Sequence, residues 1–438
     1  MNNDTVVAIS TPNAVGGISV IRMSGPQAGF IADEVFVSFS EKSSRKPSEM
    51  PGYTCAYGKI IDRKNEKTEV IDDVIITMFK SPHSYTGEDV AEISCHGGLL
   101  ISKKILRLLI SKGARQAKAG EFTKIAFMNG KIDLSQAEAV MSLISAGSEA
   151  ELTNAIRLRE GILYKKINLI KNEIVNFSAK LAYWSDNPDE EIEIDLTVLE
   201  KISDTLKNLA ATYDYGKVME TGIKTAIAGK PNVGKSSLMN RLLGYDRSIV
   251  TNVAGTTRDM VSEKIDIGIK IELLDTAGIH ESDDKIENIG VNIAKRAIDE
   301  ADLVICVLST DDTELIDLPE QKRIIYVLNK TDKGDVDLNF PHIKISVKED
   351  RGIDELITAI KAEFAESVPE NDVIIANERQ YNCILNCLGV LEEIEEGIPY
   401  DALTVELDDA LGFLLELTGE SVSDIVVNEV FKKFCVGK

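Results

Sequence analysis

One eight-residue segment, Gly229-Lys-Pro-Asn-Val-Gly-Lys-Ser236, does most to restrict what this chain can fold into. It has the G-x-x-x-x-G-K-S pattern of a phosphate-binding loop, follows the β-like run Ile223–Ala228, and opens a helix-like stretch that contains Leu238 and Leu242. In such a loop the glycines let backbone N–H groups converge on phosphate oxygens at a helix N-terminus, and Lys235 bridges the outer phosphates. The segment therefore predicts a nucleotide-binding α/β domain.

Strand-like and helix-like segments alternate on both sides of this loop, from residue 217 to about residue 368. The strand-like runs are Thr225–Ala228, Ile271–Leu274, Leu303–Leu308, Ile324–Leu328 and Ile343–Ile345. Such alternation of β and α units predicts a mostly parallel, doubly wound sheet.

The flanking segments have other patterns. Residues 1–118 mix short β-like runs with one helix-like stretch near Leu99 to Lys112, which predicts a small α+β domain. Residues 119–216 and 369–438 have helical periodicity. We therefore expect the α/β domain, residues 217–368, to be inserted into a helical domain whose two parts lie on either side of it.

Further motifs predict a Mg²⁺ site beside the phosphates. The hydroxyl of Ser236 ends the phosphate loop, where such a group ligates Mg²⁺. Asp275 follows the strand-like run Ile271–Leu274 and places a carboxylate at the same edge of the sheet. Thr257, in the segment between the loop and that strand, is our candidate for the second hydroxyl ligand.

The base-recognition motif is Asn329-Lys-Thr-Asp332, after the strand-like run Ile324–Leu328. A carboxylate at Asp332 accepts hydrogen bonds from N1–H and the amino group of guanine, whereas adenine would leave it unpaired. This predicts a P-loop GTPase of the Ras-like type. The predicted GTP-binding residues are Asn232, Val233, Gly234, Lys235, Ser236, Ser237, Thr251, Asn252, Val253, Ala254, Gly255, Thr256, Thr257, Asp275, Thr276, Ala277, Gly278, Asn329, Lys330, Asp332, Ser346, Val347 and Lys348.

One position departs from the Ras-like pattern. Ile279 stands where Ras-like proteins have the glutamine that orients the attacking water. Another residue must then position the water, and Glu287 is a candidate. From spacing alone, an ordinary carboxylate on a helix surface is the preferred interpretation of Glu287.

Composition limits the remaining classes of protein. The 438 residues have a formal net charge of -23, so the overall field repels nucleic acid and any RNA contact needs a local basic patch. No apolar run approaches the roughly 20 residues of a membrane span, so we expect a cytoplasmic protein. Among the six cysteines, Cys383 and Cys387 lie one helical turn apart, which favours core packing over half of a metal site.

The sequence resembles the MnmE (TrmE) family of tRNA-modification GTPases over essentially its full length. The motifs that carry the resemblance are Ala14-Val-Gly-Gly-Ile-Ser-Val-Ile-Arg22, Tyr85-Thr-Gly-Glu-Asp-Val-Ala-Glu92, Cys95-His-Gly-Gly98, Gly120-Glu-Phe-Thr, Asn129-Gly-Lys131-Ile-Asp-Leu-Ser-Gln-Ala-Glu-Ala, the GTPase set above and the terminal Phe434-Cys435-Val-Gly-Lys438. The Cys-Val-Gly-Lys ending is far more specific than the phosphate loop, which identifies only a superfamily.

The resemblance implies a function and partners. It implies an N-terminal tetrahydrofolate-binding domain, a homodimer formed largely through that domain, and a heterotetramer with the FAD-dependent MnmG (GidA). Together the two proteins would install a 5-aminomethyl or 5-carboxymethylaminomethyl group on the wobble uridine of certain tRNAs. A 5-formyl- or 5,10-methylene-tetrahydrofolate donor would be bound by Arg22, Glu92, Lys131 and Lys438, since a pterin offers N–H donors and a folate tail offers carboxylates.

The resemblance also implies activation by K⁺. Asn232, Thr251, Val253 and Thr256 would supply oxygen ligands to a K⁺ ion that takes the place of an arginine finger. Family members also orient water with a glutamate at the position of Glu287. In the mechanism that we infer, K⁺-assisted dimerisation of the G domains triggers hydrolysis and moves the helical domain.

Three questions stay open at this point. Cys435 is either a reactive thiol favoured by nearby lysines or part of a frayed terminus. The basic stretch Lys103, Lys104, Arg107, Lys112, Arg115, Lys118 and Lys124 is either a tRNA contact or a solvated face. The alternative function is a GTPase switch in ribosome assembly like Era and Der, which leaves the first 120 residues and the Cys-Val-Gly-Lys ending without a role.

Overall fold

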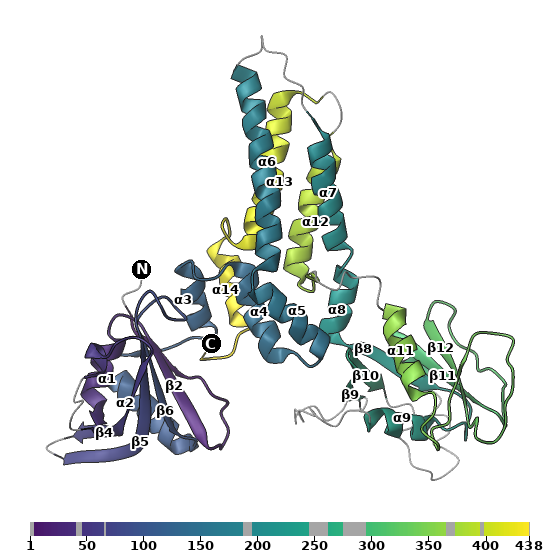
Figure 1. The fold of residues 1–438 in the computed structure, drawn as a ribbon, viewed down its shortest axis with the longest axis horizontal. Helices are drawn as coiled ribbons and strands as arrows, with labels where there is room; N and C mark the ends of the chain where they lie inside the picture. Colours follow the sequence, from purple (N-terminus) through teal and green to yellow (C-terminus); the bar gives the residue numbers. More distant parts are fainter. Residues whose placement is uncertain are drawn as a thin grey trace. The chain divides into compact units, whose positions relative to one another are not determined.

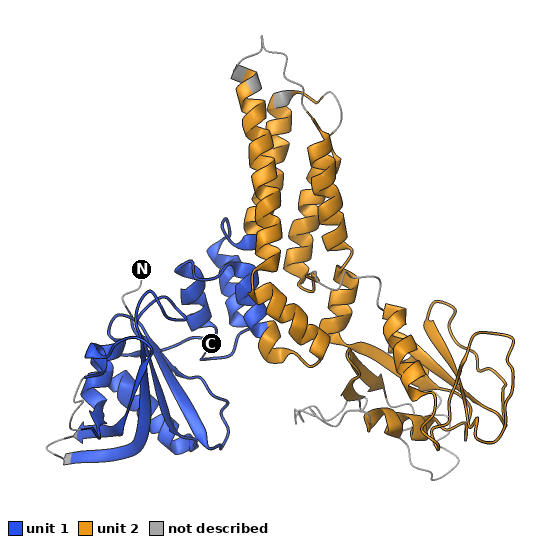
Figure 2. Ribbon diagram, in the orientation of Figure 1, with its two compact units in different colours: residues 1–141, 418–438 blue, residues 142–417 orange. Residues whose placement is uncertain are grey.

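A computed structural model of the chain describes residues 4–40, 46–64, 67–186, 195–244, 262–274, 295–364, 373–394 and 398–437. The chain divides into two compact units (Figure 2). Unit 1 contains residues 1–141 and 418–438, and unit 2 contains residues 142–417. The domain boundaries that we expect at residues 118, 216 and 368 divide the chain differently and stay predictions.

Unit 1 is built on a seven-stranded sheet with the strand order β3-β4-β5-β6-β2-β1-β7. Its strands are β1 Val6–Ile9, β2 Ile18–Ser24, β3 Phe36–Ser38, β4 Thr54–Lys64, β5 Lys67–Phe79, β6 Val90–His96 and β7 Arg115–Gln116. Helices α1 (Ala28–Val35) and α2 (Leu99–Ser111) pack on one face, where Ile21, Ile76 and Ile93 are buried. The helix predicted near Leu99 is confirmed, as is the α+β class.

A second, smaller core in unit 1 joins the C-terminal residues to the helices that follow the N-terminal sheet. Helices α3 (Glu121–Met128), α4 (Leu134–Ser145) and α14 (Asp424–Lys432) contribute to it (Figure 1). Its buried members are Leu134, Ala137, Val427, Phe431 and Phe434. The last helix of the chain therefore packs against residues that directly follow the N-terminal sheet.

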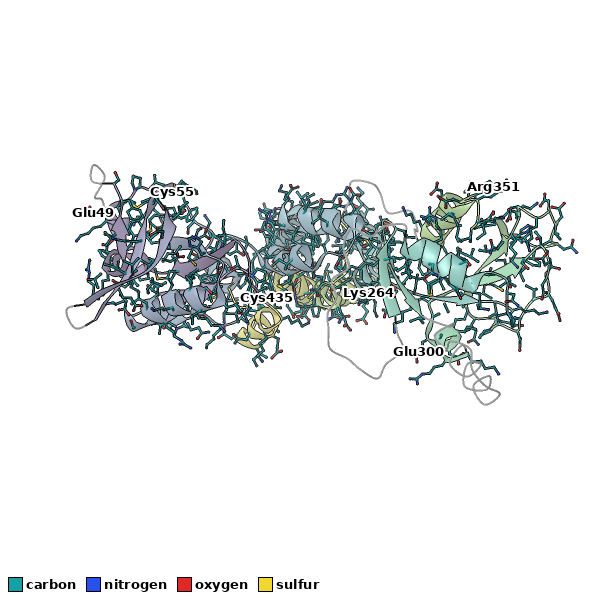
Figure 3. All side chains as sticks on the ribbon, turned by 90° about the horizontal axis from the view of Figure 1, so that it is seen from below. Glu49, Cys55, Lys264, Glu300, Arg351 and Cys435 are labelled. Carbon is teal, nitrogen blue, oxygen red and sulfur yellow. The ribbon has the colours of Figure 1, made fainter. Side chains whose placement is uncertain are left out.

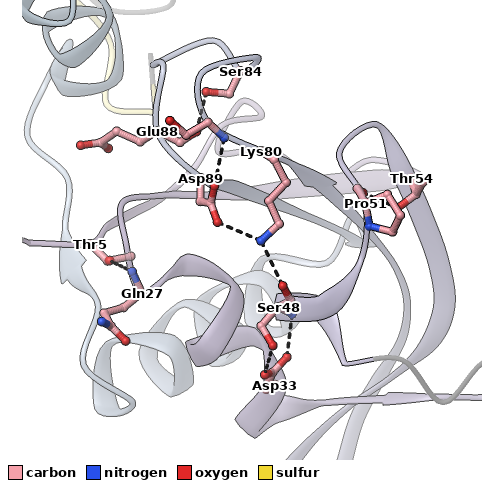
Figure 4. A network of polar contacts seen from close by, with 11 residues as sticks. Thr5, Gln27, Asp33, Ser48, Pro51, Thr54, Lys80, Ser84, Glu88 and Asp89 are labelled. Atoms are coloured by element: carbon pink, nitrogen blue, oxygen red, sulfur yellow. Dashed lines mark hydrogen bonds and ion pairs between the residues drawn. The ribbon is translucent and has the colours of Figure 1, made fainter.

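The loop between β5 and β6 is fixed by Lys80 and Asp89 (Figure 4). Lys80 Nζ donates to Asp89 Oδ2 at 2.8 Å and to the carbonyl of Ser48, in the 3₁₀ helix Pro47–Glu49, at 3.1 Å. The backbone N–H of Ser81 donates to Asp89 Oδ1 at 3.0 Å. Because both ends of the loop share Asp89, the residues between them have a defined place beside β2.

The sheet of unit 2 has the strand order β13-β12-β11-β8-β10-β9. Its strands are β8 Ile223–Ala228, β9 Ser262–Asp266, β10 Lys270–Leu274, β11 Leu303–Ser309, β12 Arg323–Asn329 and β13 Ile343–Lys344. All neighbouring strands are parallel except β9 and β10. Helices α9 (Lys235–Leu243) and α11 (Ile353–Phe364) cover one face, and Ala297 and Ala301 pack on the other. The predicted doubly wound sheet is confirmed.

Long helices form the rest of unit 2. They are α5 Glu149–Arg159, α6 Ile162–Asp186, α7 Thr197–Ala210, α8 Tyr213–Thr221, α12 Glu378–Glu392 and α13 Tyr400–Thr418. Helices α6, α7, α12 and α13 run side by side (Figure 1). Helix α8 crosses the boundary expected at residue 216 and ends at Gly222, whose φ of 83° stops the helix and turns the chain into β8.

The helices also bear on the cysteine pair and on membrane spans. Cys383 and Cys387 are both buried in α12, and burial raises the pKa of the Cys387 thiol to about 12, so these cysteines are core residues. Within the described ranges, no helix combines the length and the apolar composition of a membrane span.

Candidate nucleotide-binding site

The phosphate loop is shaped by two glycines that approach other backbone or side-chain atoms closely. Gly229 has a φ of 147°, and a Cβ there would lie 2.3 Å from the carbonyl oxygen of Val307. Gly234 has a φ of 103°, and a Cβ there would lie 2.2 Å from Nδ2 of Asn329. Neither position accepts a side chain without a shift of the loop.

The loop leads into α9 and presents its polar groups there. Lys235 Nζ donates to the carbonyls of Gly229 and Lys230, both at 2.8 Å, and burial lowers the pKa of this ammonium group. Ser236 and Ser237 are exposed in the first turn of α9, and Asn232 is exposed with a φ of 64°. A phosphate group would compete with the two carbonyls for the Lys235 ammonium, and the helix N-terminus favours an anion there.

The base-recognition loops join the phosphate loop through Asn329. The Asn329 side chain is buried, its Nδ2 donates to the carbonyl of Val233 at 2.9 Å, and its Oδ1 accepts from the backbone N–H of Val347 at 3.3 Å. Lys330 follows with a φ of 65°, and its ammonium group lies 3.5 Å from Asp311 Oδ2. The structure therefore brings together three predicted segments that are far apart in the sequence.

Asp332 is held as a carboxylate acceptor. The hydroxyl of Ser346 donates to Asp332 Oδ1 at 2.8 Å. This hydrogen bond, with smaller contributions from the positive charges of Lys348 and Lys333, lowers the pKa of Asp332. An ionised carboxylate at this position is the acceptor that the two N–H donors of guanine require.

The sheet explains why these residues meet. In the parallel strands β11 and β12, Ser309 is opposite Asn329, and β8 ends at Ala228, next to Gly229. The carboxyl ends of parallel strands lie at one edge, where α/β proteins bind ligands.

Two contacts at this edge were not predicted. Lys230 of the phosphate loop pairs with Asp312 and Glu314, and the backbone N–H of Thr310 donates to the carbonyl of Asn329 at 3.2 Å. The sequence signal for these contacts is the acidic turn after β11. Such turns are common at strand ends, so this signal was too weak to predict the contacts.

Several predicted site residues lie outside the described ranges. They are Thr251, Asn252, Val253, Ala254, Gly255, Thr256, Thr257, Asp275, Thr276, Ala277, Gly278, Glu287 and Lys438. Within the described ranges, no three His, Cys, Asp or Glu side chains are grouped as a metal site would need. The part of the predicted site whose geometry is described therefore consists of Asn232, Val233, Gly234, Lys235, Ser236, Ser237, Asn329, Lys330, Asp332, Ser346, Val347 and Lys348.

The predicted folate residues Arg22 and Glu92 form an ion pair in unit 1. They are opposite each other on β2 and β6, and Arg22 Nε lies 2.7 Å from Glu92 Oε1. The Arg22 guanidinium carbon lies 5.6 Å from the ring centre of Tyr85 and 5.7 Å from that of Phe122. These contacts hold a charged pair against two aromatic rings on the sheet face opposite α1 and α2.

Lys131, between α3 and α4, packs against the loop between β5 and β6 that carries Tyr85. Its Nζ donates to the carbonyl of Pro82 at 3.0 Å, and its stem lies beside Gly87. Tyr85 in turn hydrogen-bonds to Thr123 of α3 at 2.8 Å. The structure thus places Arg22, Glu92 and Lys131 around one loop of unit 1.

The end of the chain is attached to the N-terminal sheet. The backbone N–H of Gly120 donates to the carbonyl of Cys435 at 3.3 Å, and the hydroxyl of Ser10 donates to the carbonyl of Gly437 at 3.1 Å. The Cys435 side chain is exposed (Figure 3). A frayed terminus does not describe residues 434–437, and a chemical role of the thiol stays a prediction.

Much of the predicted basic stretch is neutralised by carboxylates. Lys104 pairs with Glu69, Lys112 with Glu34, and Arg115 with Asp4 and Glu121. Lys118 and Lys124 line a cavity of about 930 Å³ between α3 and α14, to which Arg22, Glu92 and Lys131 do not contribute. The charge left for a phosphate contact is therefore smaller than the sequence count indicates.

Comparison with known families and proteins assigns both units. A family model described as the GTP-binding protein TrmE N-terminus matches residues 5–131, and one described as the MnmE helical domain matches residues 134–435. A tRNA modification GTPase MnmE from Lactobacillus helveticus is 40% identical over 471 residues, with 99% of this chain and 98% of the relative covered. The Acetivibrio thermocellus MnmE is 39% identical over 464 residues, covering 99% of each chain.

Among solved structures, Era in complex with MgGDPNP and a 16S ribosomal RNA fragment is similar to part of the chain. The two are 29% identical, the match covers 40% of this chain and 68% of Era, and the TM-score is 0.26. The MnmE relatives, by contrast, match the sheet of unit 1, the helices and the GTPase motifs together. The chain therefore belongs to the MnmE (TrmE) family of tRNA modification GTPases.

Proposed function

We propose that this GTPase acts with an FAD-dependent MnmG (GidA) partner to form the 5-aminomethyl or 5-carboxymethylaminomethyl group on the wobble uridine of certain tRNAs. The observation that carries the GTPase half of the proposal is the Asn329 side chain, which ties the phosphate loop to the guanine-recognition loops. The observation that carries the modification half is the Arg22–Glu92 pair in the TrmE-like unit.

The described phosphate loop fits a Mg²⁺–GTP complex. Ser236 has an exposed hydroxyl in the first turn of α9, as the metal shell requires, and Thr257 is our proposed second ligand. When bound, Mg²⁺ would neutralise charge on the β- and γ-phosphates. Lys235 would leave its two loop carbonyls for the phosphates, Asp332 would fix the base, and Glu287 would orient water.

A K⁺ ion is the proposed source of the additional positive charge. Asn232 is exposed in the phosphate loop with a left-handed backbone, so its amide oxygen is free to turn toward an ion beside the phosphates. Thr251, Val253 and Thr256 are the other proposed ligands. The chain would then need no arginine finger, and two G domains would meet across their nucleotides.

A tetrahydrofolate derivative, 5-formyl or 5,10-methylene, is the proposed one-carbon donor. Glu92 would accept from pterin N–H groups, and Arg22, Lys131 and Lys438 would bind carboxylates or hold Glu92 in place. The rings of Tyr85 and Phe122 beside Arg22 supply flat apolar surface for a pterin.

A homodimer through unit 1 is proposed from the uncovered face of its sheet. Tyr57 and Ile75 are opposite each other on β4 and β5 and are 58% and 46% exposed, and Ile18 on β2 is 68% exposed. An uncovered sheet face with large apolar side chains is typical of an interface. A second copy would cover it and bring two folate sites close together.

The proposal is tested by reconstitution. The full chain, a purified MnmG, FAD, a tetrahydrofolate donor, an amine donor and tRNA without the modification are incubated with GTP, and the wobble nucleoside is analysed by mass spectrometry. We expect modification with GTP and little with GDP or a non-hydrolysable analogue. No modification under any condition, together with normal GTP hydrolysis, would favour the Era/Der-like switch in ribosome assembly.

A further inference from the structure

In unit 2, one lysine connects the nucleotide-binding sheet to two helices. Lys270 is the first residue of β10, and its Nζ lies 2.5 Å from Oε2 of Glu151 in α5. The same ammonium group lies 3.4 Å from the carbonyl oxygen of Glu220, near the end of α8. Lys270 therefore contacts α5 and α8 while it begins a strand of the GTPase sheet.

The Glu151–Lys270 pair is enclosed and specific. The side chains of Glu151 and Lys270 are only 8% and 20% exposed. The Glu151 carboxylate also accepts from the backbone N–H of Gly147 at 2.8 Å, at the N-terminus of α5, where the helix dipole favours a negative charge. A Cβ on Gly147 would lie 2.4 Å from Cε of Lys270, so the lysine stem packs directly on the backbone. Removal of one partner from such a pair costs more than in an exposed pair, because the other charge is left enclosed without its partner.

Two neighbouring strands begin at this pair and lead to the nucleotide. In the parallel pair β8 and β10, Ile271 is opposite Ile223. Strand β8 leads into the phosphate loop at Gly229, and Asp275 follows β10 in the sequence. At about 3.3 Å per residue, strands of this length span about 16–20 Å. A hydrogen-bonded strand is stiff along its axis, so a displacement of its carboxyl end reaches Lys270.

Helix α5 also holds the segment that leaves the α/β part of unit 2. Asn154, one turn after Glu151, donates from Nδ2 to the carbonyl of Ile374 and accepts from the N–H of Ile374 at Oδ1, both at 2.9 Å. The Asn154 side chain is buried. One face of α5 thus contacts both the start of β10 and the returning chain.

We propose that Glu151 and Lys270 are positioning residues for GTP hydrolysis. They fix the start of β10, and thereby the strand that leads to Asp275, and they pass a displacement of that strand to α5. The inference rests on the proposed function in one respect, namely that GTP is hydrolysed at the carboxyl end of β10. The Glu151–Lys270 ion pair then connects that end of the sheet to α5.

The first test is kinetic. We expect Glu151→Gln and Lys270→Met to lower kcat for GTP hydrolysis by about fivefold or more and to change the Kd for GDP by less than about twofold, because neither residue contacts the nucleotide. Lys270→Arg keeps the charge and should retain at least about half of the wild-type kcat. The matched controls are Glu149→Gln, exposed in the same turn of α5, and Lys264→Met, exposed on β9 (Figure 3).

The second test separates positioning from general stability. Hydrogen exchange of α5 is compared between the GDP and the GDP–aluminium fluoride states of the full chain. We expect a nucleotide-dependent difference in the wild type and both controls, and its loss in Glu151→Gln and Lys270→Met. If Lys270→Met does not fold, Glu151→Gln, which keeps the side-chain volume, carries the test alone.

The outcomes distinguish the inference from the proposed function. Wild-type kcat and wild-type exchange differences in both variants would overturn the inference and leave the GTPase assignment intact. A wild-type chain whose α5 exchange does not respond to the nucleotide would overturn it as well. A wild-type chain without GTP hydrolysis would contradict the proposed function, and the inference would fall with it.

Discussion

Asn329 donates a hydrogen bond from its side-chain Nδ2 to the carbonyl of Val233 at 2.9 Å, across 96 positions of the sequence. The same amide accepts from the N–H of Val347 at 3.3 Å. The predicted phosphate-binding loop and the predicted base-binding loops are therefore joined by one buried side chain.

Substitution of Asp332 tests base recognition. In Asp332→Asn the amide no longer accepts from both guanine N–H groups but donates to the O2 of xanthine, so we expect KM for GTP to rise about 100-fold or more and XTP to become a substrate. Steady-state hydrolysis of both nucleotides measures this. Asp335→Asn, which removes an exposed pair with Lys344, is the matched control and should behave as wild type.

The pH dependence of GTP binding follows from the same carboxylate. The hydrogen bond from Ser346 lowers the pKa of Asp332, so the charged acceptor persists as the pH falls and is lost only below its ordinary range. We expect the contribution of Asp332 to GTP affinity to be constant between about pH 8 and about pH 5. A loss of affinity within that range in the wild type, absent from Asp332→Asn, would mean that the pKa is raised instead.

Two glycines in unit 2 provide a steric test of the phosphate loop. Gly234→Ala places a Cβ 2.2 Å from Asn329 Nδ2 at a φ of 103°. We expect it to break the Asn329–Val233 contact and to weaken GDP binding by about 100-fold or more. In Gly244→Ala the nearest atom is 3.4 Å away and φ is -84°, so GDP binding should be unchanged. Isothermal titration calorimetry measures both.

Substitutions of two neighbouring C-terminal residues distinguish a role in packing from a role in chemistry. Phe434 is buried against Phe431, with ring centres 5.1 Å apart, so Phe434→Ala should lower the stability of unit 1 by about 3–5 kcal/mol. Cys435 is exposed, and Cys435→Ser should leave Tm nearly unchanged. Thermal unfolding gives the first comparison. If the thiol reacts, Cys435→Ser abolishes tRNA modification and retains GTP hydrolysis; retained modification would remove the chemical role.

Folate binding is tested at the Arg22–Glu92 pair. Glu92→Gln keeps the shape but removes the charge that pterin N–H groups and Arg22 share, so we expect affinity for 5-formyltetrahydrofolate to fall about tenfold or more. Equilibrium dialysis with the full chain measures it. Glu69→Gln, in an exposed pair with Lys104 on the same unit, is the control. Equal affinity in all three proteins would place the folate elsewhere.

The sequence was sufficient for features that depend on local patterns. The strands that end at Ala228 and Asn329 are short apolar runs followed by loop motifs, so the strands and a mostly parallel sheet were predictable. Strand β9 was not predicted, because Ser262–Asp266 contains one apolar residue between charged ones and pairs only as an antiparallel edge strand. Tertiary pairing, not propensity, makes it a strand.

Contacts between distant residues were beyond sequence reasoning. Lys230 pairs with Glu314, and Lys270 is enclosed by Gly147 and Glu151. No periodicity or motif in the sequence indicates either contact. The docking of Gly437 beside Ser10 depends on the path of the whole chain. The sequence motifs indicated which residues form the candidate sites, whereas the contacts that join these residues could be seen only in the fold.

The most direct test of the central claim is steady-state GTP hydrolysis by the full chain in KCl and in NaCl at equal ionic strength, with Asn232→Ala beside the wild type. The account predicts strong stimulation by K⁺ in the wild type and its loss in the variant, because the amide of Asn232 is the proposed ligand in the described part of the site. Equal, slow rates in both salts, or full K⁺ stimulation of Asn232→Ala, would contradict it.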